Sequence, residues 1–207
     1  MDPIMIEQQS MAIIESELHT PLPEEIKPVV MRVIHATADF SFADTLTFSP
    51  GVVPSIRALL AKGTTVITDT NMALAGINKA ALQHTCSTAL CYMADEDVAA
   101  EARTRGETRA SISMERALSL SGPRLLVCGN APTFLFPLLE RIESGDLIPD
   151  DLAVIGVPVG FVNVVEAKER LLASGLPCIV SRGRRGGSTV AAAIVNALLY
   201  GMPGGRV

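Results

Sequence analysis

The sequence predicts an α/β fold: a three-layer, open parallel sheet with helices on both faces, preceded by an N-terminal helical extension. Short, continuous apolar runs alternate with helical patterns, as in parallel sheets that are covered on both faces. Each run ends in glycine or small polar residues, which mark strand-to-helix junctions. A chain of 207 residues that is 48% hydrophobic can bury one sizeable core, so we expect residues 1–207 to form a single domain.

The N-terminal part of the chain, roughly its first sixty residues, has helical patterns. An amphipathic first helix is indicated by the apolar residues Ile6, Met11, Ile13, Ile14 and Leu18. Glu24 and Glu25, which follow Pro23, place acids at the start of a second helix. We expect this extension either to pack on the sheet or to reach a partner subunit.

The apolar runs predicted to be strands are residues 65–68, 125–128, 152–155 and 178–180, with 87–93 as a candidate for a further short strand. Ligands of open parallel sheets bind beside the carboxyl ends of the strands. The turns that contain Gly129, Asn130, Gly156 and Gly160 are therefore candidate walls of one pocket. The alternative, for each turn considered by itself, is that it only connects a strand to the following helix.

Residues 182–187, which we call the arginine–glycine loop, follow the last predicted strand and interleave three arginines with three glycines. Ser188 and Thr189 then open an apolar helix. Glycines let backbone N–H groups approach a ligand, helix N-termini favour anions, and arginine forks bind carboxylate or phosphate. The loop is predicted to bind an anion; a glycine-rich turn with solvated arginines is the alternative.

Composition excludes several classes of function. Tryptophan is absent, aromatic residues make up 4% of the chain and the net charge is −5, which argues against nucleic-acid binding. The cysteines Cys86, Cys91, Cys128 and Cys178 lie in apolar runs without metal-ligand spacing, so we expect reduced core thiols and no metal site. A polyanionic ligand would require local positive charge, such as the arginine–glycine loop supplies.

Nothing in the sequence indicates a membrane protein. The N-terminus carries an acid at Asp2 and lacks the basic and apolar regions of a signal peptide. No uncharged apolar stretch reaches the roughly 18 residues that a bilayer span needs. We expect a soluble, cytoplasmic protein.

His35 is the strongest candidate for acid–base chemistry. It ends a predicted helix, with Arg32 three residues before it and Asp39 four residues after it, so all three would share one face if the helix continued. A carboxylate can orient an imidazole and favour its charged form, which makes a general acid. The alternative is a helix-terminal histidine that stabilises the helix dipole.

Common nucleotide-binding and nucleophile motifs are missing. There is no Walker A sequence, no GxGxxG after a strand and no GxSxG. The sequence therefore points to proton transfer on a bound anionic substrate.

The chain closely resembles the precorrin-8X methylmutase family of cobalamin biosynthesis. The motifs that carry this resemblance are Arg-Val-Ile-His-Ala-Thr-Ala-Asp-Phe at 32–40, Gly-Asn-Ala-Pro-Thr at 129–133, Gly-Val-Pro-Val-Gly-Phe-Val at 156–162 and Arg-Gly-Arg-Arg-Gly-Gly-Ser at 182–188. The similarity runs from about residue 4 to residue 199 and keeps the motifs in order. The form of the first motif is more similar to the branch that acts on cobalt-containing intermediates.

The resemblance implies a flavodoxin-like topology and an isomerase that moves a methyl group from C-11 to C-12 of a corrinoid ring. The product would be hydrogenobyrinate, or cobyrinate when cobalt is present, and no cofactor would be consumed. His35 would be the acid that opens the way to a suprafacial 1,5-sigmatropic shift. The family is homodimeric with its site near the subunit interface, so we expect a homodimer.

The resemblance also implies a set of substrate-binding residues. They are Ser10, Arg32, Asp69, Asn71, Met72, Arg109, Gly129, Asn130, Thr133, Gly160, Arg182, Gly183, Arg184, Gly186, Gly187 and Ser188. Two other functions stay open at this point: a corrinoid carrier that releases its ligand unchanged, and an isomerase or transferase for another anionic metabolite.

Overall fold

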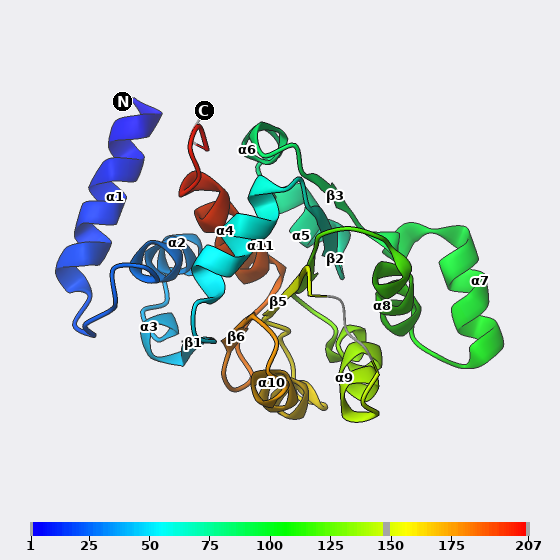
Figure 1. Cartoon of the computed structure of the whole chain (residues 1–207). Coiled ribbons are helices and arrows are strands. Elements are labelled where there is room, and N and C mark those ends of the chain that lie inside the picture. Colours follow the sequence, from blue (N-terminus) through cyan, green and yellow to red (C-terminus); the bar gives the residue numbers. More distant parts are fainter. Residues whose placement is uncertain (1, 147–149, 206–207) are drawn as a thin grey trace.

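The computed structural model describes residues 2–146 and 150–205, in which a six-stranded sheet lies between layers of helices (Figure 1). The strands in these ranges are β1 (Leu46–Phe48), β2 (Thr65–Thr68), β3 (Thr88–Leu90), β4 (Arg124–Cys128), β5 (Leu152–Gly156) and β6 (Cys178–Ser181). The helices are α1 (Pro3–Glu17), α2 (Lys27–Thr37), α3 (Phe42–Thr45), α4 (Val52–Ala61), α5 (Asn71–Gly76), α6 (Lys79–His84), α7 (Glu96–Arg105), α8 (Arg109–Ser119), α9 (Phe136–Glu143), α10 (Val164–Ala173) and α11 (Ser188–Tyr200), with the 3-10 helices η1 (Tyr92–Ala94) and η2 (Pro132–Phe134).

The strands lie in the order β1-β6-β5-β4-β2-β3. All neighbouring pairs from β6 to β3 are parallel, and β1 pairs with β6 in the antiparallel direction. Taken in chain order, the parallel strands stand second, first, third, fourth and fifth across the sheet, which is the flavodoxin-like order. The predicted α/β fold is therefore confirmed, with an antiparallel strand added at one edge.

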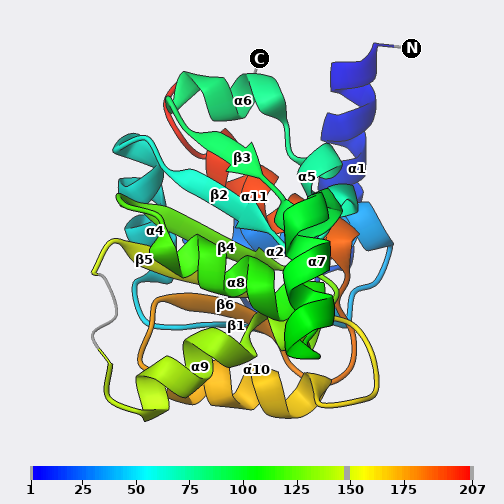
Figure 2. The same ribbon diagram turned by 90° about the vertical axis from the view of Figure 1, so that its right-hand side faces the viewer.

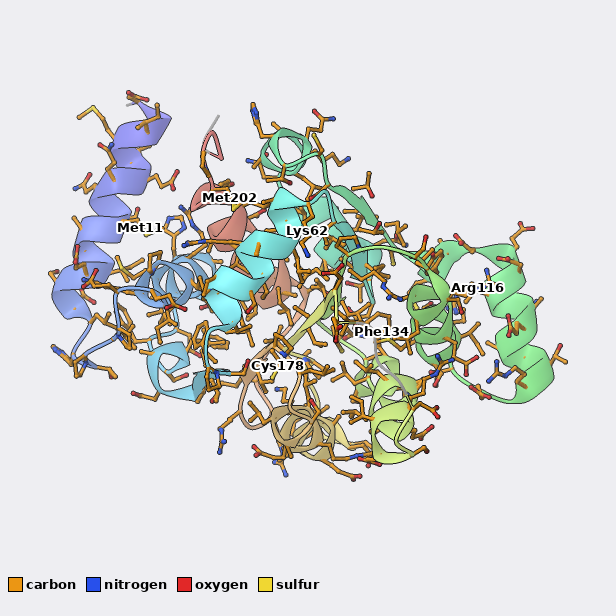
Figure 3. All side chains as sticks on the ribbon, in the orientation of Figure 1. Met11, Lys62, Arg116, Phe134, Cys178 and Met202 are labelled. Carbon is orange, nitrogen blue, oxygen red and sulfur yellow. The ribbon has the colours of Figure 1, made fainter. Side chains whose placement is uncertain are left out.

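Alternate residues of each strand point to opposite faces, and both faces are buried. In β4, Leu125 and Val127 belong to the core beneath α2, α4 and α11, whereas Leu126 and Cys128 pack under α8, α9 and α10. Figure 2 shows α8, α9 and α10 along one side of the sheet, with α7 outside α8. Side chains fill the space between the layers, where Phe134 and Cys178 are fully buried (Figure 3).

The two predicted N-terminal helices are present, and α1 lies outside α2 rather than on the sheet (Figure 1). The predicted acidic start of the second helix is wrong, because Glu24 and Glu25 lie in a turn and α2 begins at Lys27. Two ion pairs join them, Glu15–Lys27 and Glu7–Arg32, each with 2.6 Å between nitrogen and oxygen. Of the predicted apolar face of α1, Ile14 is buried. The apolar residues of α1 that remain exposed are Ile4, Met5, Ile6 and Ile13.

Two predicted helical regions differ in the structure. Residues 46–48 were expected to be helical and instead form β1, because the outer edge of β6 offers unpaired backbone groups to an extended segment. The sequence of residues 95–118 has a helical pattern throughout, and the structure divides this stretch into α7 and α8. Gly106, at φ 68°, takes the left-handed conformation that ends α7.

The cysteines are unpaired, as predicted, but they are not all in the core. Cys128 and Cys178 are buried, Cys91 is half-buried and Cys86 is exposed. The predicted core location is wrong for Cys86, which adopts positive φ in the turn after α6.

The Ile155→Ala variant tests the core between β5 and the helices above it. Ile155 is fully buried, so removal of its side chain should lower the free energy of unfolding by about 2–5 kcal/mol. The matched control is Ile13→Ala on α1, where the side chain is half exposed and the expected change is below about 1 kcal/mol. Urea titration of the two variants measures both values, and equal losses would contradict the assigned core.

Candidate anion-binding site at the carboxyl edge of the sheet

The loops that follow β2, β5 and β6 meet at the carboxyl edge of the sheet. The hydroxyl oxygens of Thr70, after β2, and Ser188, at the start of α11, are 2.7 Å apart. The backbone N–H of Gly160, after β5, donates to the carbonyl of Arg184 at 3.2 Å. The structure thus brings together segments that the sequence placed at one edge.

Asp69 fixes the turn after β4 from beneath. Its carboxylate accepts hydrogen bonds from the backbone N–H groups of Gly129 (2.8 Å), Asn130 (2.7 Å) and Ala131 (2.8 Å). Burial raises the pKa of this carboxyl group, and the N–H donors oppose that shift. Asp69 is fully buried, so it holds the Gly129–Asn130 turn in place rather than facing a ligand.

Two glycines are required by close approach of the backbone. A Cβ atom on Gly129 would lie 2.9 Å from Cα of Ser188, and one on Gly186 would lie 2.2 Å from the carbonyl oxygen of Val157. Such contacts are far shorter than carbon–carbon and carbon–oxygen contact distances. These glycines let the turns after β4 and β5 pack directly against the arginine–glycine loop and the start of α11.

The arginine–glycine loop carries three exposed guanidinium groups, of which Arg185 pairs with Asp39 and Arg182 lies 3.9 Å from Glu169. Arg182, Arg184 and Arg185 are all exposed, and the guanidinium of Arg184 lies 5.2 Å from the ring centroid of Phe161. Gly187 is the N-cap of the 13-residue helix α11, and no side chain of this cap accepts a hydrogen bond from the first N–H groups of the helix. The helix dipole and the arginines together favour an anion here.

Apolar side chains are exposed beside these cations. Val159, Phe161 and Val162 follow β5, and Met72 opens α5 next to the exposed Asn71. Phe161 is 82% exposed and Met72 is 70% exposed, values that are unusual for large apolar side chains. This edge therefore combines a cationic loop with an uncovered apolar surface.

His35 lies in the last turn of α2 and is exposed. The helix ends two residues later, because Ala38 adopts the left-handed conformation at φ 53°. The expected His35–Asp39 pair is therefore wrong: the Asp39 carboxylate accepts from Nη1 of Arg185 at 2.6 Å and from the N–H of Ser41. Ser41 and Arg185 keep the pKa of Asp39 below its usual value. Asp39 thus ties the end of α2 to the arginine–glycine loop.

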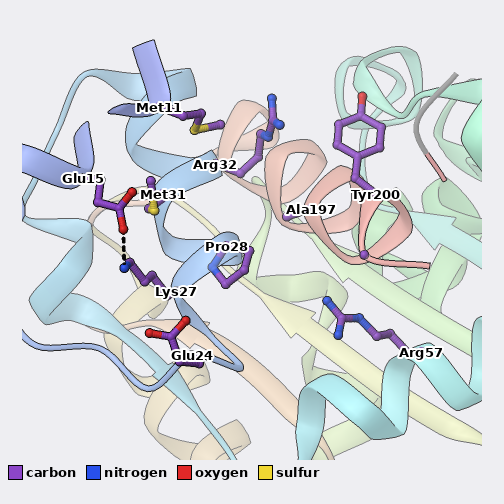
Figure 4. Close-up of a pocket in the computed structure, with 11 residues that line it drawn as sticks. Met11, Glu15, Glu24, Lys27, Pro28, Met31, Arg32, Arg57, Ala197 and Tyr200 are labelled. Carbon is purple, nitrogen blue, oxygen red and sulfur yellow. Dashed lines mark hydrogen bonds and ion pairs between the residues drawn. The ribbon is translucent and has the colours of Figure 1, made fainter. Parts of the chain in front are cut away.

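Arg32 lies away from that loop. Its guanidinium pairs with Glu7 at 2.6 Å and stacks over the ring of Tyr200 at 5.1 Å. Together with Arg57 it lines a cavity of about 440 Å³ between α1, α2, α4 and α11 (Figure 4). Because α11 begins at Ser188 and ends at Tyr200, this cavity is about 20 Å from the loop along the helix.

Three further predicted residues lie outside the arginine–glycine loop. The Ser10 hydroxyl donates to the carbonyl of Ile6 within α1. Arg109, at the start of α8, donates to the carbonyl of Met93 after β3, at 3.1 Å. The carbonyl of Thr133, in η2 after β4, accepts from Ser111 at 3.4 Å. Arg109 and Thr133 therefore lie at the β3 and β4 end of the same sheet edge.

Within residues 2–146 and 150–205, no group of three or more His, Cys, Asp or Glu side chains could hold a metal ion. None of the helices in those ranges is long and apolar enough to cross a bilayer.

Lys168 is a residue of this site that sequence reasoning missed. It is fully buried in α10, and its ammonium donates to two carbonyls of the arginine–glycine loop. A signal was present: Lys168 falls in the helical stripe formed with Val164, Ala167 and Leu171, all of which are buried. A lysine on the apolar face of a helix needs a polar partner inside the protein.

The strand order defines a flavodoxin-like α/β protein, with a cationic loop and exposed apolar side chains at the carboxyl edge of its sheet. A profile of the family described as precorrin-8X methylmutase matches residues 5–201. The chain therefore belongs to the precorrin-8X methylmutase family, and it is an isomerase.

Individual relatives agree with this assignment. The chain is 44% identical over 182 residues to cobalt-precorrin-8 methylmutase of Salmonella typhimurium, covering 87% of this chain and 82% of the relative. It is 39% identical over 196 residues to precorrin-8X methylmutase of Pseudomonas aeruginosa, covering 93% of both. The crystal structure of precorrin-8x methyl mutase from Thermus thermophilus superposes with a TM-score of 0.83 at 36% identity, covering 94% of this chain and 95% of that one.

The Asp69→Asn variant tests the support of the turn after β4. An amide in place of the carboxylate cannot accept from all three N–H groups, so the free energy of unfolding should fall by about 1–3 kcal/mol. Asp151→Asn, at a half-exposed residue paired with Lys62, is the control and should cost below about 1 kcal/mol. Denaturant titration compares the two, and an unaltered Asp69→Asn protein would show that the buried carboxylate is not needed.

Proposed function

We propose that this enzyme moves a methyl group from C-11 to C-12 of a corrinoid ring, converting precorrin-8X to hydrogenobyrinate or cobalt-precorrin-8 to cobyrinate. The observation that carries this proposal is the uncapped N-terminus of α11 inside a loop with exposed Arg182 and Arg184. The acetate and propionate groups at the rim of such a ring are carboxylates, which helix N-termini and arginine forks bind.

The breadth of the edge supports a macrocycle rather than a small phosphorylated metabolite. The loop after β6 and Arg109, beside the segment after β3, are separated by four strand spacings, about 19 Å. Exposed Phe161 and Met72 lie along the same edge, where they would contact the apolar body of a ring. In this proposal, some of the sixteen residues implied by the resemblance contact the substrate directly. Others, such as Asp69, hold the backbone of the loops that contact it.

His35 is proposed as the general acid. It would protonate or hydrogen-bond the ring system, which shifts electron density and lets the methyl group migrate suprafacially in a 1,5-sigmatropic step. The ring then returns the proton to the imidazole, so the reaction is an isomerisation without a co-reactant or consumed cofactor. The exposure of His35 and the Asp39–Arg185 contact, which joins its helix to the arginine–glycine loop, support this role.

We also propose a homodimer with the site near the subunit interface. The exposed apolar residues of α1, including Ile4, Met5 and Ile13, and those beside the arginine–glycine loop are the surfaces that a second copy would cover. Ser10 and Arg32 do not contact the arginine–glycine loop of their own chain. In the proposed homodimer, they would contribute to the site formed by the loop of the second copy. Of the two substrates, cobalt-precorrin-8 is favoured because the motif at residues 32–40 is more similar to that of the branch acting on cobalt-containing intermediates.

The His35→Ala variant tests the proposed acid. The variant should fold normally and lose about 10²- to 10⁴-fold in turnover, because general acid catalysis contributes about that much. An anaerobic absorbance assay with precorrin-8X and with cobalt-precorrin-8 follows conversion to the rearranged chromophore. The control is His84→Ala, at the exposed end of α6, which should retain full turnover.

Other outcomes of that assay separate the alternatives. Full turnover by His35→Ala, with only a small loss of stability, would favour the alternative of a helix-terminal histidine that stabilises the helix dipole. Tight binding without conversion by the wild type would indicate a corrinoid carrier. Displacement of the corrinoid by a phosphorylated metabolite would favour the other isomerase or transferase.

The Arg182→Ala and Arg184→Ala variants test the anion-binding loop. Each should raise the dissociation constant of the corrinoid by about tenfold to a hundredfold, because a charge-assisted hydrogen bond is lost, with a smaller effect on the chemical step. Arg103→Ala, at an exposed position of α7, is the control and should bind normally. Unchanged binding in both loop variants would show that this loop faces something else.

A further inference from the structure

Lys168 lies beneath the arginine–glycine loop. It is 0% exposed in α10, and its Nζ donates to the carbonyl of Gly183 at 2.8 Å and to that of Arg185 at 2.7 Å. No carboxylate in residues 2–146 and 150–205 pairs with it. Burial of an ammonium without a counter-ion costs free energy, which its hydrogen bonds to the two carbonyls offset only in part.

The two carbonyls set the direction of two N–H groups. A trans peptide is planar, with its C=O and the following N–H pointing in opposite directions. When Lys168 draws the carbonyls of Gly183 and Arg185 inward, the N–H groups of Arg184 and Gly186 turn outward. Neither N–H has an acceptor in the described part of the chain.

Other contacts fix the ends of the loop, and one of them also reaches the Arg185–Gly186 peptide. Arg182 donates its N–H to the carbonyl of Thr45 at 2.8 Å, and Gly187 donates to that of Val157 at 2.9 Å. The Ser181 hydroxyl donates to the carbonyl of Arg185 at 2.8 Å, so this carbonyl accepts from both Ser181 and Lys168. The Gly183 carbonyl, by contrast, has Lys168 as its donor.

We infer that Lys168 is a positioning residue for substrate binding: it aims the N–H groups of Arg184 and Gly186 at a substrate carboxylate and places a positive charge directly beneath that carboxylate. This inference rests on the proposed function, because it assumes that the arginine–glycine loop binds carboxylates of the corrinoid. It assigns a role on the binding side of the reaction, distinct from that of His35.

The charge of Lys168 is titratable near neutral pH. Burial lowers the pKa of Lys168 to about 8, so the ammonium is mostly charged at pH 7 and mostly neutral at pH 9. The titratable groups on the elements around α10 are the buried thiols Cys128 and Cys178, the exposed Glu140, Arg141 and Glu143 of α9, and the exposed arginines Arg182, Arg184 and Arg185. Of these, Cys128 acts on Lys168, and burial keeps the pKa of its thiol well above the usual value.

Ligand affinity and protein stability should therefore respond to pH in opposite directions. The folded pKa of Lys168, about 8, lies below the ordinary lysine value of 10.5, so the folded state disfavours the charged form. Its contribution to stability rises as the pH passes through 8 towards 10.5. Affinity for a carboxylate, however, falls over the same range because the positive charge is lost.

The test measures the dissociation constant of cobyrinate, the proposed product, for the full-length protein between pH 7 and pH 9. The wild type should bind several-fold more weakly at pH 9. Lys168→Met should bind about tenfold to a hundredfold more weakly at pH 7, with no further loss at pH 9. Lys168→Arg, which keeps its charge at both pH values, should recover much of the affinity and show a flat profile.

Steady-state kinetics separate positioning from chemistry. Lys168→Met should raise KM by a factor similar to the loss of affinity, while kcat stays within about threefold, because the variant removes binding made before the transition state. Lys62→Met, at an exposed lysine paired with Asp151, is the control and should match the wild type in KM and in pH profile. Wild-type affinity and pH profile in Lys168→Met would overturn the inference while leaving the proposed function intact.

Hydrogen exchange tests the role of Lys168 without any ligand. In Lys168→Met, or in Lys168→Gln if the first variant does not fold, the hydrogen-bonded amides of Arg182 and Gly187 should exchange faster than in the wild type. If the wild type neither binds nor converts a corrinoid, the proposed function fails, and this measurement still decides whether Lys168 holds the loop. Unchanged exchange at both amides would overturn that role.

Discussion

The carboxyl edge of the sheet depends on one constraint: the backbone groups of its loops must be satisfied from inside the protein, so that the outer groups stay free for a ligand. Two buried side chains, one acidic and one basic, supply these inner hydrogen bonds. The carboxylate of Asp69 takes the N–H groups of the turn after β4, and the ammonium of Lys168 takes carbonyls of the loop after β6. Each fixes the side of its loop that faces the core. In the proposed function, the backbone groups that would face the ligand are thus oriented by the buried side chains of Asp69 and Lys168.

The parallel strands, their junctions and the position of the arginine–glycine loop could be predicted because each leaves a local mark: a continuous apolar run, a glycine-rich turn or a helix start. β1 left none, since its three residues become a strand only by pairing with β6. The burial of Asp69 could not be predicted either, because it depends on a turn sixty residues further along the chain. Lys168 was predictable in principle from the apolar stripe of α10, but a single lysine among charged neighbours reads as a surface residue.

His35 shows how one backbone conformation redirects a predicted pair. The spacing to Asp39 is helical, but Ala38 turns left-handed and ends α2 first. Asp39 then reaches Arg185 and Ser41 instead of His35. Within residues 2–146 and 150–205, no side chain is therefore placed to orient the imidazole of His35 as the predicted Asp39 contact would have done. The Asp39–Arg185 contact instead joins the end of α2, which carries His35, to the loop that would bind the carboxylates in the proposed function.

Local charge outweighs the charge of the whole chain at this edge. The net charge of −5 opposes a polyanionic ligand at long range, but at physiological ionic strength the screening length is about 8 Å. Salt therefore largely screens the acids that lie far from the loop. Lys168 is buried, so salt ions do not surround it, and its charge acts at short distance through a medium of lower dielectric constant. The charges of the exposed Arg182 and Arg184 are screened by salt more than that of Lys168 and less than those of distant acids. Binding that depends on the arginines should weaken with added salt, and the part contributed by Lys168 should persist, because only the buried charge is sheltered from the ions.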